Sequence, residues 1–374
     1  MKRLLAACVL VSGLGCGAFP PVAVHPDDAP AGRLSPLWQV QLEEHPVLAF
    51  FPKELAWPSY ANGGQLVLAG SDRGTLTGVD AATGRVRWQF ATQGKIRAAP
   101  RVVGIHAYLG GMDGKLYKID ARNGNPAGHQ WPFETRGAIS TQPTVDEKHA
   151  YFRNNENRLY AVDAKTGRYA WEVARQRNEE LTITGESTPV VHGDLVYCGF
   201  DDGVLLAVSR DAGATVWSKS LAGAETKFVD VDTTPVVADG TVYAGSFASG
   251  LYALDARTGG VGWWMNARGI QSPAYDGTYL YVTTVDGVLS ALDPKTGAPV
   301  WQAAFPKAEL SPPTLVDDKL LVATGRSVAV VDAGSGRVLA RMGADDGQAS
   351  QAVSANGLVH FVTNSGALIG ARLH

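Results

Sequence analysis

One turn sequence recurs along most of this 374-residue chain, and it constrains the fold more than any other feature. The pattern Asp-x-x-Thr-Gly-x-x-x-Trp occurs in GVDAATGRVRW (78–88), AVDAKTGRYAW (161–171), ALDARTGGVGW (253–263) and ALDPKTGAPVW (291–301). Degenerate copies end at Trp131, at Trp217 and at Ala340, which stands in the tryptophan position. The turn glycines are Gly84, Gly124, Gly167, Gly213, Gly259, Gly297 and Gly336, and they lie 38 to 46 residues apart. A period near 40 residues indicates stacked or circular units, and this length fits one four-stranded sheet per unit.

The unit before Trp263 shows how the strands alternate with turns. Apolar residues alternate in 235–238, 241–244 and 251–254, and a fourth strand follows Gly259. Asp239-Gly240 and Ser249-Gly250 separate these strands, and such pairs favour tight hairpins. The Asp and Thr side chains of the repeated turn can bond nearby backbone amides, while glycine adopts positive φ without a steric penalty. The turn is therefore encoded locally.

The tryptophans that follow the turns are too large for one four-stranded sheet to cover. We expect each to pack against the neighbouring unit, where its burial contributes about 2–3 kcal/mol. The predicted inter-blade tryptophans are Trp38, Trp88, Trp171, Trp217, Trp263 and Trp301.

The two ends of the chain supply an eighth unit. The C-terminal SANGLVHFVTNSGALIGARLH provides strands but stops where the repeated turn should follow, and LWQVQL with Trp38 provides the missing outer strand. Pairing the ends removes an exposed sheet edge. The sequence therefore predicts an all-β, eight-bladed β-propeller of four-stranded antiparallel blades, closed by the N-terminal strand on the C-terminal blade.

The N-terminus resembles an export signal. Lys2 and Arg3 precede an apolar run over 4–14 that is too short to span a bilayer. We predict a lipoprotein signal peptide over 1–16 with a lipid such as palmitate on Cys16, a tether rich in proline and alanine over 17–36, and the propeller over 37–374. Cys8 competes as the lipidation site, and ordinary cleavage without a lipid stays an alternative.

Composition excludes several other functions. The 33 Lys+Arg and 36 Asp+Glu are nearly balanced and form no long run of one sign, so nucleic acid is not an expected partner. After cleavage and acylation Cys198 would be the one thiol left, which leaves no intrachain disulfide. The eight histidines show no zinc-ligand spacing, and no phosphate loop or nucleophile elbow is present. We expect no catalytic residue, metal or cofactor.

The repeat resembles the pyrroloquinoline-quinone-type repeat, which occurs in quinoprotein dehydrogenases and in non-enzymes. Two stretches, LTITGESTPVV (181–191) and DVDTTPVV (230–237), are similar to segments of the family of the outer-membrane protein assembly factor BamB. The resemblance implies a non-catalytic scaffold lipoprotein on the periplasmic face of the outer membrane. It also implies docking on the POTRA domains of BamA, within the hetero-complex that assembles outer-membrane β-barrels, with the scaffold itself a monomer.

The resemblance places the partner contacts in the same two stretches. The implied contact residues are Leu181, Ile183, Glu186, Asp230 and Asp232. Thr184 stands where the family has an arginine, so a charged contact is missing there. Leu181 and Ile183 are alternatively inward-facing strand residues, Glu186 a turn or rim residue, and Asp230 and Asp232 caps of a tight turn.

Two other functions stay open at this point. One is a periplasmic propeller that binds a small ligand or an envelope polymer in its central channel. The other is a quinoprotein dehydrogenase, although such enzymes are usually larger and commonly carry an adjacent cysteine pair, which this chain lacks. Most of the Asp residues of the repeats, such as Asp80 and Asp255, have a sufficient structural role in the turns.

Overall fold

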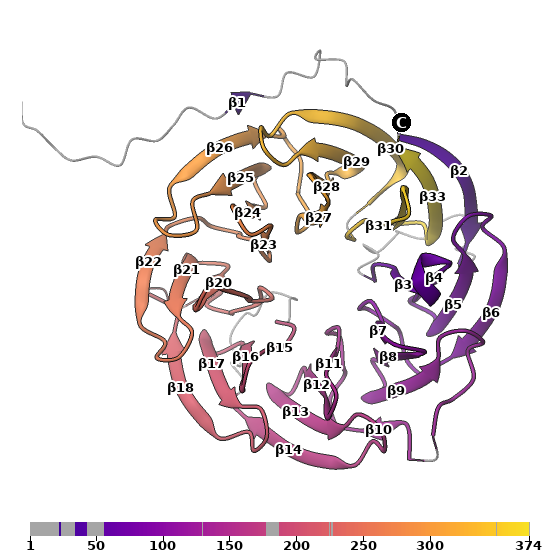
Figure 1. Ribbon diagram of the computed structural model, residues 1–374, viewed down its shortest axis with the longest axis horizontal. Helices are drawn as coiled ribbons and strands as arrows, with labels where there is room; N and C mark the ends of the chain where they lie inside the picture. The colour runs from indigo at the N-terminus through magenta and orange to yellow at the C-terminus, as the bar shows by residue number, and fades with distance from the viewer. Residues whose placement is uncertain are drawn as a thin grey trace, which may run out of the picture.

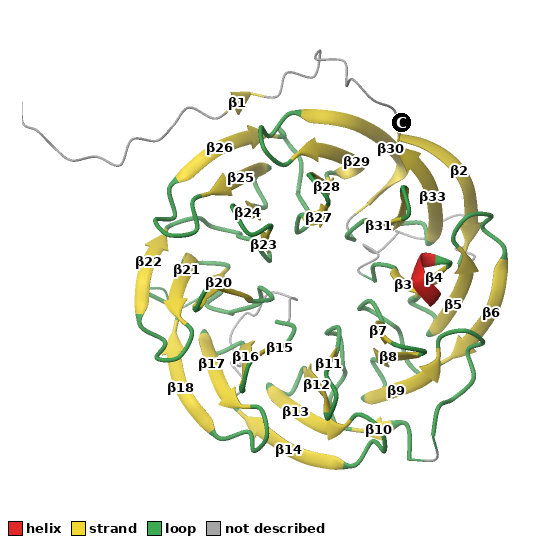
Figure 2. Ribbon diagram, in the orientation of Figure 1, coloured by secondary structure: helices red, strands yellow, loops and turns green. Residues whose placement is uncertain are grey.

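The computed structural model describes residues 22–23, 34–42, 56–128, 130–176, 187–223, 225, 227–348 and 350–373. These residues form eight sheets arranged in a closed ring around a central opening (Figure 1). The single helical element among them is a short 3₁₀ turn, η1 (Asn62–Gly64), as Figure 2 shows. The predicted all-β, eight-bladed propeller is confirmed.

Each blade is an antiparallel sheet whose strands follow one another from the central opening outward. Blades one to four consist of β3 (Ser59–Ala61), β4 (Leu66–Ala69), β5 (Thr75–Asp80) and β6 (Val86–Ala91); β7 (Arg101–Val103), β8 (His106–Gly110), β9 (Lys115–Asp120) and β10 (Phe133–Glu134); β11 (Thr144–Val145), β12 (His149–Asn154), β13 (Arg158–Asp163) and β14 (Tyr169–Ala174); β15 (Val190–His192), β16 (Leu195–Gly199), β17 (Val204–Ser209) and β18 (Thr215–Ser220).

The remaining four blades repeat this order. They consist of β19 (Val236–Ala238), β20 (Thr241–Ser246), β21 (Gly250–Asp255) and β22 (Val261–Met265); β23 (Ala274–Tyr275), β24 (Leu280–Thr283), β25 (Val288–Leu292) and β26 (Pro299–Ala304); β27 (Thr314–Val316), β28 (Lys319–Ala323), β29 (Gly325–Asp332) and β30 (Val338–Gln348); β31 (Val353–Ala355), β32 (Leu358–Val362), β33 (Ala367–Leu373) and β2 (Leu34–Gln41). The strands predicted before Trp263 correspond to β19, β20 and β21.

The antiparallel order gives the propeller two distinct faces. One face carries the loops between first and second strands, such as Asp239-Gly240, and the repeated turns, such as 256–260; we call it the hairpin face. The opposite face carries the loops between second and third strands, such as 200–203, and the connections from blade to blade, such as 221–235; we call it the crossover face. The second stretch that resembles the family and the described residues 187–189 of the first stretch lie in connections of the crossover face.

The repeated turn has the local geometry that its sequence predicts. In blade five, Asp255 Oδ1 accepts hydrogen bonds from the backbone N–H and the hydroxyl of Thr258, both at 2.8 Å. The N–H of Gly259 donates to the Asp255 carbonyl at 2.8 Å, and Gly259 has a φ of 70°. This positive φ favours glycine because it has no Cβ.

The tryptophans lie between neighbouring blades, each on the turn glycine of the next blade. A Cβ built on Gly259 would lie 2.8 Å from the Trp217 ring, so the glycine also permits the close approach of the indole. Trp217 Nε1 donates to the Ala256 carbonyl at 2.9 Å. Equivalent contacts join Trp38 to Gly84, Trp88 to Gly124, Trp131 to Gly167, Trp171 to Gly213, Trp263 to Gly297 and Trp301 to Gly336.

The chain ends close the ring as predicted. β2 pairs antiparallel with β33, from Leu34 opposite Leu373 to Gln41 opposite Ala367, and Figure 1 shows the two strands side by side. β2 begins at Leu34, within the predicted tether, because the Leu34 side chain is buried against blades seven and eight. Farther upstream, β1 (Val22–Ala23) pairs in parallel with the outer strand β26.

A buried histidine joins blade eight to blade one beside this closure. His360 occupies the position that tyrosine holds in most other blades, and its ring lies 5.1 Å from that of Trp38. Its Nε2 lies 3.0 Å from the Ala81 carbonyl and its Nδ1 2.6 Å from the Tyr60 hydroxyl. These distances fit a neutral ring that donates from Nε2 and accepts at Nδ1. Burial lowers the pKa of His360 to about 4, because the charged form is poorly solvated there.

Candidate functional site

The two family-like stretches are joined directly on the crossover face. Ser187 Oγ donates to the Thr233 carbonyl at 2.9 Å and accepts from the Gly199 N–H at 3.1 Å. Thr233 Oγ1 makes the matching pair of bonds with the carbonyl and the N–H of Gly245. Part of the sequence similarity therefore has a structural reason, because Ser187 and Thr233 fix the entry of the chain into successive blades.

A buried arginine lies at the centre of the charged groups on this face. Arg153, at the end of β12 in blade three, has no exposed surface. Its guanidinium pairs with Asp201 in the β16–β17 loop of blade four, donates to Asn157 Oδ1 at 2.8 Å, and lies 5.4 Å from the centre of the Phe200 ring. A buried charge is tolerated only when it is paired in this way. Arg153 therefore fixes blade three against blade four.

A second ion pair holds the connection that leaves blade three. Arg175 Nε lies 2.6 Å from Asp202 Oδ2, and Asn157 Nδ2 donates to the Gln176 carbonyl at 2.7 Å. Burial raises the pKa of Asp202, and the pairing with Arg175 partly opposes this shift. These contacts fix the end of blade three as far as Gln176.

Asp230 and Asp232 differ in their accessibility. Asp230 is only 2% exposed, whereas Asp232 keeps part of its surface exposed. The Val231 N–H between them donates to the Phe200 carbonyl at 3.1 Å, which ties this stretch to the loop that carries Asp201. Asp232 is thus the partly exposed residue of the pair, although its Oδ1 atom is buried, and Asp230 lies beneath the surface.

The Asp232 carboxyl is held in an unusual electrostatic state. Protein atoms packed around it raise its pKa to about 7, mainly because burial disfavours the charged form, and the charge of Asp230 adds to this shift. Arg153 lowers the pKa and Asp201 raises it. A carboxyl in this state gains most from a cationic side chain of a partner, which would stabilise the ionised form.

The remaining predicted site residues fall outside the described residues. These are the predicted lipidation residue Cys16 and the first-stretch residues Leu181, Ile183 and Glu186. Thr184, which stands where the family has an arginine, also lies outside the described residues. Cys198 is described; it is buried, and its thiol lies 3.8 Å from the Ser187 carbonyl oxygen. Within the described part of the chain, no three His, Cys, Asp or Glu side chains are placed to hold a metal ion. No helix in that part is long and apolar enough to cross a membrane.

Two features of the structure were missed in the sequence. Arg153 lies outside both family-like stretches, and nothing in a single sequence indicates that it meets Asp201 from the next blade. Trp131, which is not among the predicted inter-blade tryptophans, lies seven positions after Gly124, whereas the predicted tryptophans that follow a turn glycine lie four positions after it. The presence of a tryptophan after a repeated turn, at whatever distance, is the sequence signal that identifies Trp131 as an inter-blade residue.

The comparisons with solved structures describe the fold. BamB from Moraxella catarrhalis matches with a TM-score of 0.77 and 19% identity, over 91% of this chain and 99% of that one. A quinohemoprotein alcohol dehydrogenase from Pseudomonas putida matches with a TM-score of 0.71 and 14% identity, over 95% of this chain and 78% of that one. A quinohemoprotein alcohol dehydrogenase from Comamonas testosteroni matches with a TM-score of 0.69 and 12% identity, over 91% of this chain and 76% of that one. At such identities the likeness extends to the propeller and no further.

Sequence comparison is more selective. A search of curated proteins found no significant match. A family model described as outer membrane protein assembly factor BamB matches residues 28–131, 126–273 and 249–372, which together span the propeller. By this match the chain belongs to the family of the outer membrane protein assembly factor BamB.

Proposed function

We propose that this chain is a non-catalytic scaffold of the machine that assembles outer-membrane β-barrel proteins, and that it docks on the POTRA domains of BamA. The family match and the likeness to BamB support the role. The observation that carries the proposed docking site is the charged cluster of the crossover face, in which the partly exposed Asp232 interacts electrostatically with Arg153 and Asp201. This cluster includes the second of the two stretches in which the resemblance places the partner contacts.

The two aspartates have different roles in the proposed site. Asp232 contacts a basic group of the partner, and Asp230 acts as a positioning residue, because its side chain is buried and its negative charge raises the pKa of Asp232. Leu181, Ile183 and Glu186 belong to the proposed contact set through the resemblance. Asp201 and Arg153 hold the loops beneath the contact surface.

The proposed attachment completes the function. A lipid on Cys16 would anchor the chain to the periplasmic face of the outer membrane, and residues 17 to 33 would link the lipid to β2. Mass spectrometry of the mature N-terminus tests this part by itself. A diacylated and N-acylated Cys16 supports the anchor, whereas an unmodified N-terminus downstream of Cys16 contradicts it.

Co-purification with POTRA domains tests the docking site. We expect Asp232→Lys to abolish co-purification, because it replaces an acidic contact with a like charge towards a basic partner. The matched control is Asp194→Lys, which makes the same change at an exposed position of the hairpin face of blade four. Circular dichroism and thermal unfolding show whether both variants fold. Unchanged binding by a folded Asp232→Lys variant contradicts the site.

A further inference from the structure

Blade seven lacks both of the aromatic rings that face the next blade in blades two to six. In blade six, the register places Tyr281, Ala291 and Trp301 side by side, and the two rings lie 6.1 Å apart. The same register in blade seven places Leu321, Val330 and Ala340 side by side. Tyrosine and tryptophan form this pair in blades two to six, as Tyr108–Trp131, Tyr151–Trp171, Tyr197–Trp217, Tyr243–Trp263 and Tyr281–Trp301.

The absence of the rings follows from the way the propeller closes. In blades one to six the tryptophan rests on the turn glycine of the next blade, as Trp301 does on Gly336. Blade eight has no such turn, because its third and fourth strands are the two ends of the propeller. Leu34 packs in the same cluster as Ala340 and covers part of this position. None of the described residues that line this position is aromatic.

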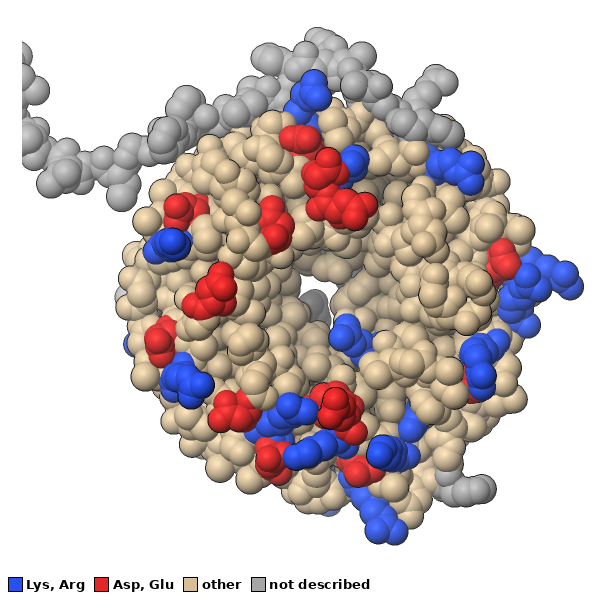
Figure 3. Space-filling view, in the orientation of Figure 1, with Lys and Arg blue, Asp and Glu red and all other residues tan. Residues whose placement is uncertain are grey.

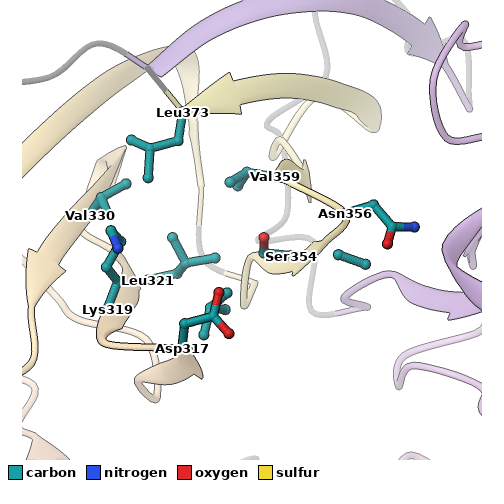
Figure 4. A pocket seen from close by; sticks show the side chains of 11 residues that line it. Asp317, Lys319, Leu321, Val330, Ser354, Asn356, Val359 and Leu373 are labelled. Carbon is teal, nitrogen blue, oxygen red and sulfur yellow. The ribbon is translucent and has the colours of Figure 1, made fainter.

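A pocket remains where that ring would lie. Its volume is about 230 Å³, and it opens between blades seven and eight on the hairpin face (Figure 4). Leu321, Val330, Val359 and Leu373 form its apolar walls. An apolar cavity of about 150 Å³ holds a benzene ring, so this pocket has room for one aromatic side chain.

Two charged side chains line the rim of the pocket, Asp317 and Lys319. Asp317 and Asp318 are both exposed in the loop between β27 and β28, and Lys319 pairs with Asp318, so these three residues carry a net charge of −1. The facing loop of blade eight carries Asn356, which is uncharged. Figure 3 shows acidic side chains around the central opening over blades five to seven, with some basic side chains beside them, and few charged side chains over the inner parts of blades eight and one. The mouth therefore favours a ring that lies beside a positive charge.

We infer that the pocket between blades seven and eight binds an aromatic side chain of a partner polypeptide, presented next to a lysine or arginine. The ring of the partner occupies the space that a tyrosine ring fills in blades two to six, where blade seven has Leu321. The flanking cation of the partner faces Asp317. The pocket lies on the hairpin face, opposite the charged cluster proposed to dock on POTRA domains. It is therefore a second binding site, independent of the proposed function.

The first test compares small probes on the full chain by fluorine NMR. We expect 5-fluorotryptamine to bind saturably, and 5-fluoroindole-3-acetate to bind several times more weakly because its carboxylate faces Asp317. Unlabelled isoamylamine, a cation without a ring, should not displace the tryptamine. Absence of saturable binding, equal binding of the two indoles, or displacement by isoamylamine at a similar concentration overturns the inference.

A variant that fills the pocket with a side chain tests where the probe binds. Leu321→Tyr restores the ring found in blade six, and it should weaken 5-fluorotryptamine binding by about tenfold or more. Ile105→Tyr is the matched control, since it adds a tyrosine at an exposed aliphatic position of the same face in blade two. Ser354→Phe fills the pocket from blade eight and provides a second variant if Leu321→Tyr does not fold. Unchanged affinity in a folded filled variant overturns the location.

A peptide distinguishes a polypeptide ligand from a free amine. The peptide acetyl-Lys-Trp-Lys-amide should displace 5-fluorotryptamine at a lower concentration than tryptamine itself, and Asp317→Asn should reduce this advantage. Displacement by tryptamine but not by the peptide would overturn the assignment of a polypeptide occupant. Because none of these assays uses POTRA domains, their failure is distinguishable from a failure of the proposed docking site.

Discussion

The contribution of Trp38 to ring closure can be measured with Trp38→Ala. Trp38 lies on Gly84 and Gly370, and its Nε1 donates to the Ala81 carbonyl at 3.1 Å. Truncation of a buried tryptophan costs about 3–5 kcal/mol, and the partly exposed Trp38 falls at the lower end. Loss of the hydrogen bond adds about 1 kcal/mol. We expect the free energy of unfolding to fall by about 4 kcal/mol.

The effect is large enough to detect by calorimetry. The unfolding entropy of about 340 residues is roughly 0.7 kcal/mol/K, so a loss of about 4 kcal/mol lowers the Tm by about 6 °C. Trp264→Ala is the matched control: Trp264 is 51% exposed in the outer strand β22, and its Nε1 also donates to one carbonyl, that of Ser249, at 2.6 Å. Trp264→Ala should lower the free energy of unfolding by about 1 kcal/mol. An equal or smaller Tm shift for Trp38→Ala would refute the argument that this indole secures the closure.

Three further predictions concern buried ionisable side chains. Because the pKa of His360 is about 4 in the fold and 6.5 ordinarily, the unfolded chain takes up a proton first. Stability should therefore fall by about 2 kcal/mol between pH 7.5 and pH 5, and urea unfolding of His360→Gln should show a smaller loss. Arg153→Met leaves Asp201 without its buried partner and should lower the free energy of unfolding by about 3–5 kcal/mol. In denaturant unfolding, the double variant with Asp201→Asn should lose less free energy than the sum of the two single variants. The pKa of Asp232, about 7, predicts tighter POTRA binding at pH 8 than at pH 6 in calorimetry. Binding by Asp232→Asn should be independent of pH over this range. An unchanged pH dependence in Asp232→Asn contradicts the role of Asp232 in docking.

Much of the fold could be predicted because the information is local. The turn around Asp255 and Gly259 uses contacts within five residues, so its sequence identifies it without knowledge of the rest of the chain. The missing outer strand of the last blade followed from counting strands. The start of β2 was placed too late because Pro36 suggested a tether, although an edge strand accommodates proline.

The site was less predictable because it depends on contacts between blades. The string around Asp230 and Asp232 does not distinguish a buried carboxylate from an accessible one. Arg153 meets Asp201 only after two blades have packed together. The sequence did show Ala340 in the tryptophan position, but the pocket also depends on Leu321, whose equivalence to Tyr281 appears only in the strand register.

Site-specific photo-cross-linking tests the central claim, that the crossover face of blades three to five docks on the assembly machine. A photoreactive amino acid replaces Lys227, which is exposed in the connection that leads to Asp232, or Asp194, which is exposed on the hairpin face of blade four. The account predicts cross-links to POTRA domains from position 227 and none from position 194. Cross-links from position 194 with none from position 227 would contradict it.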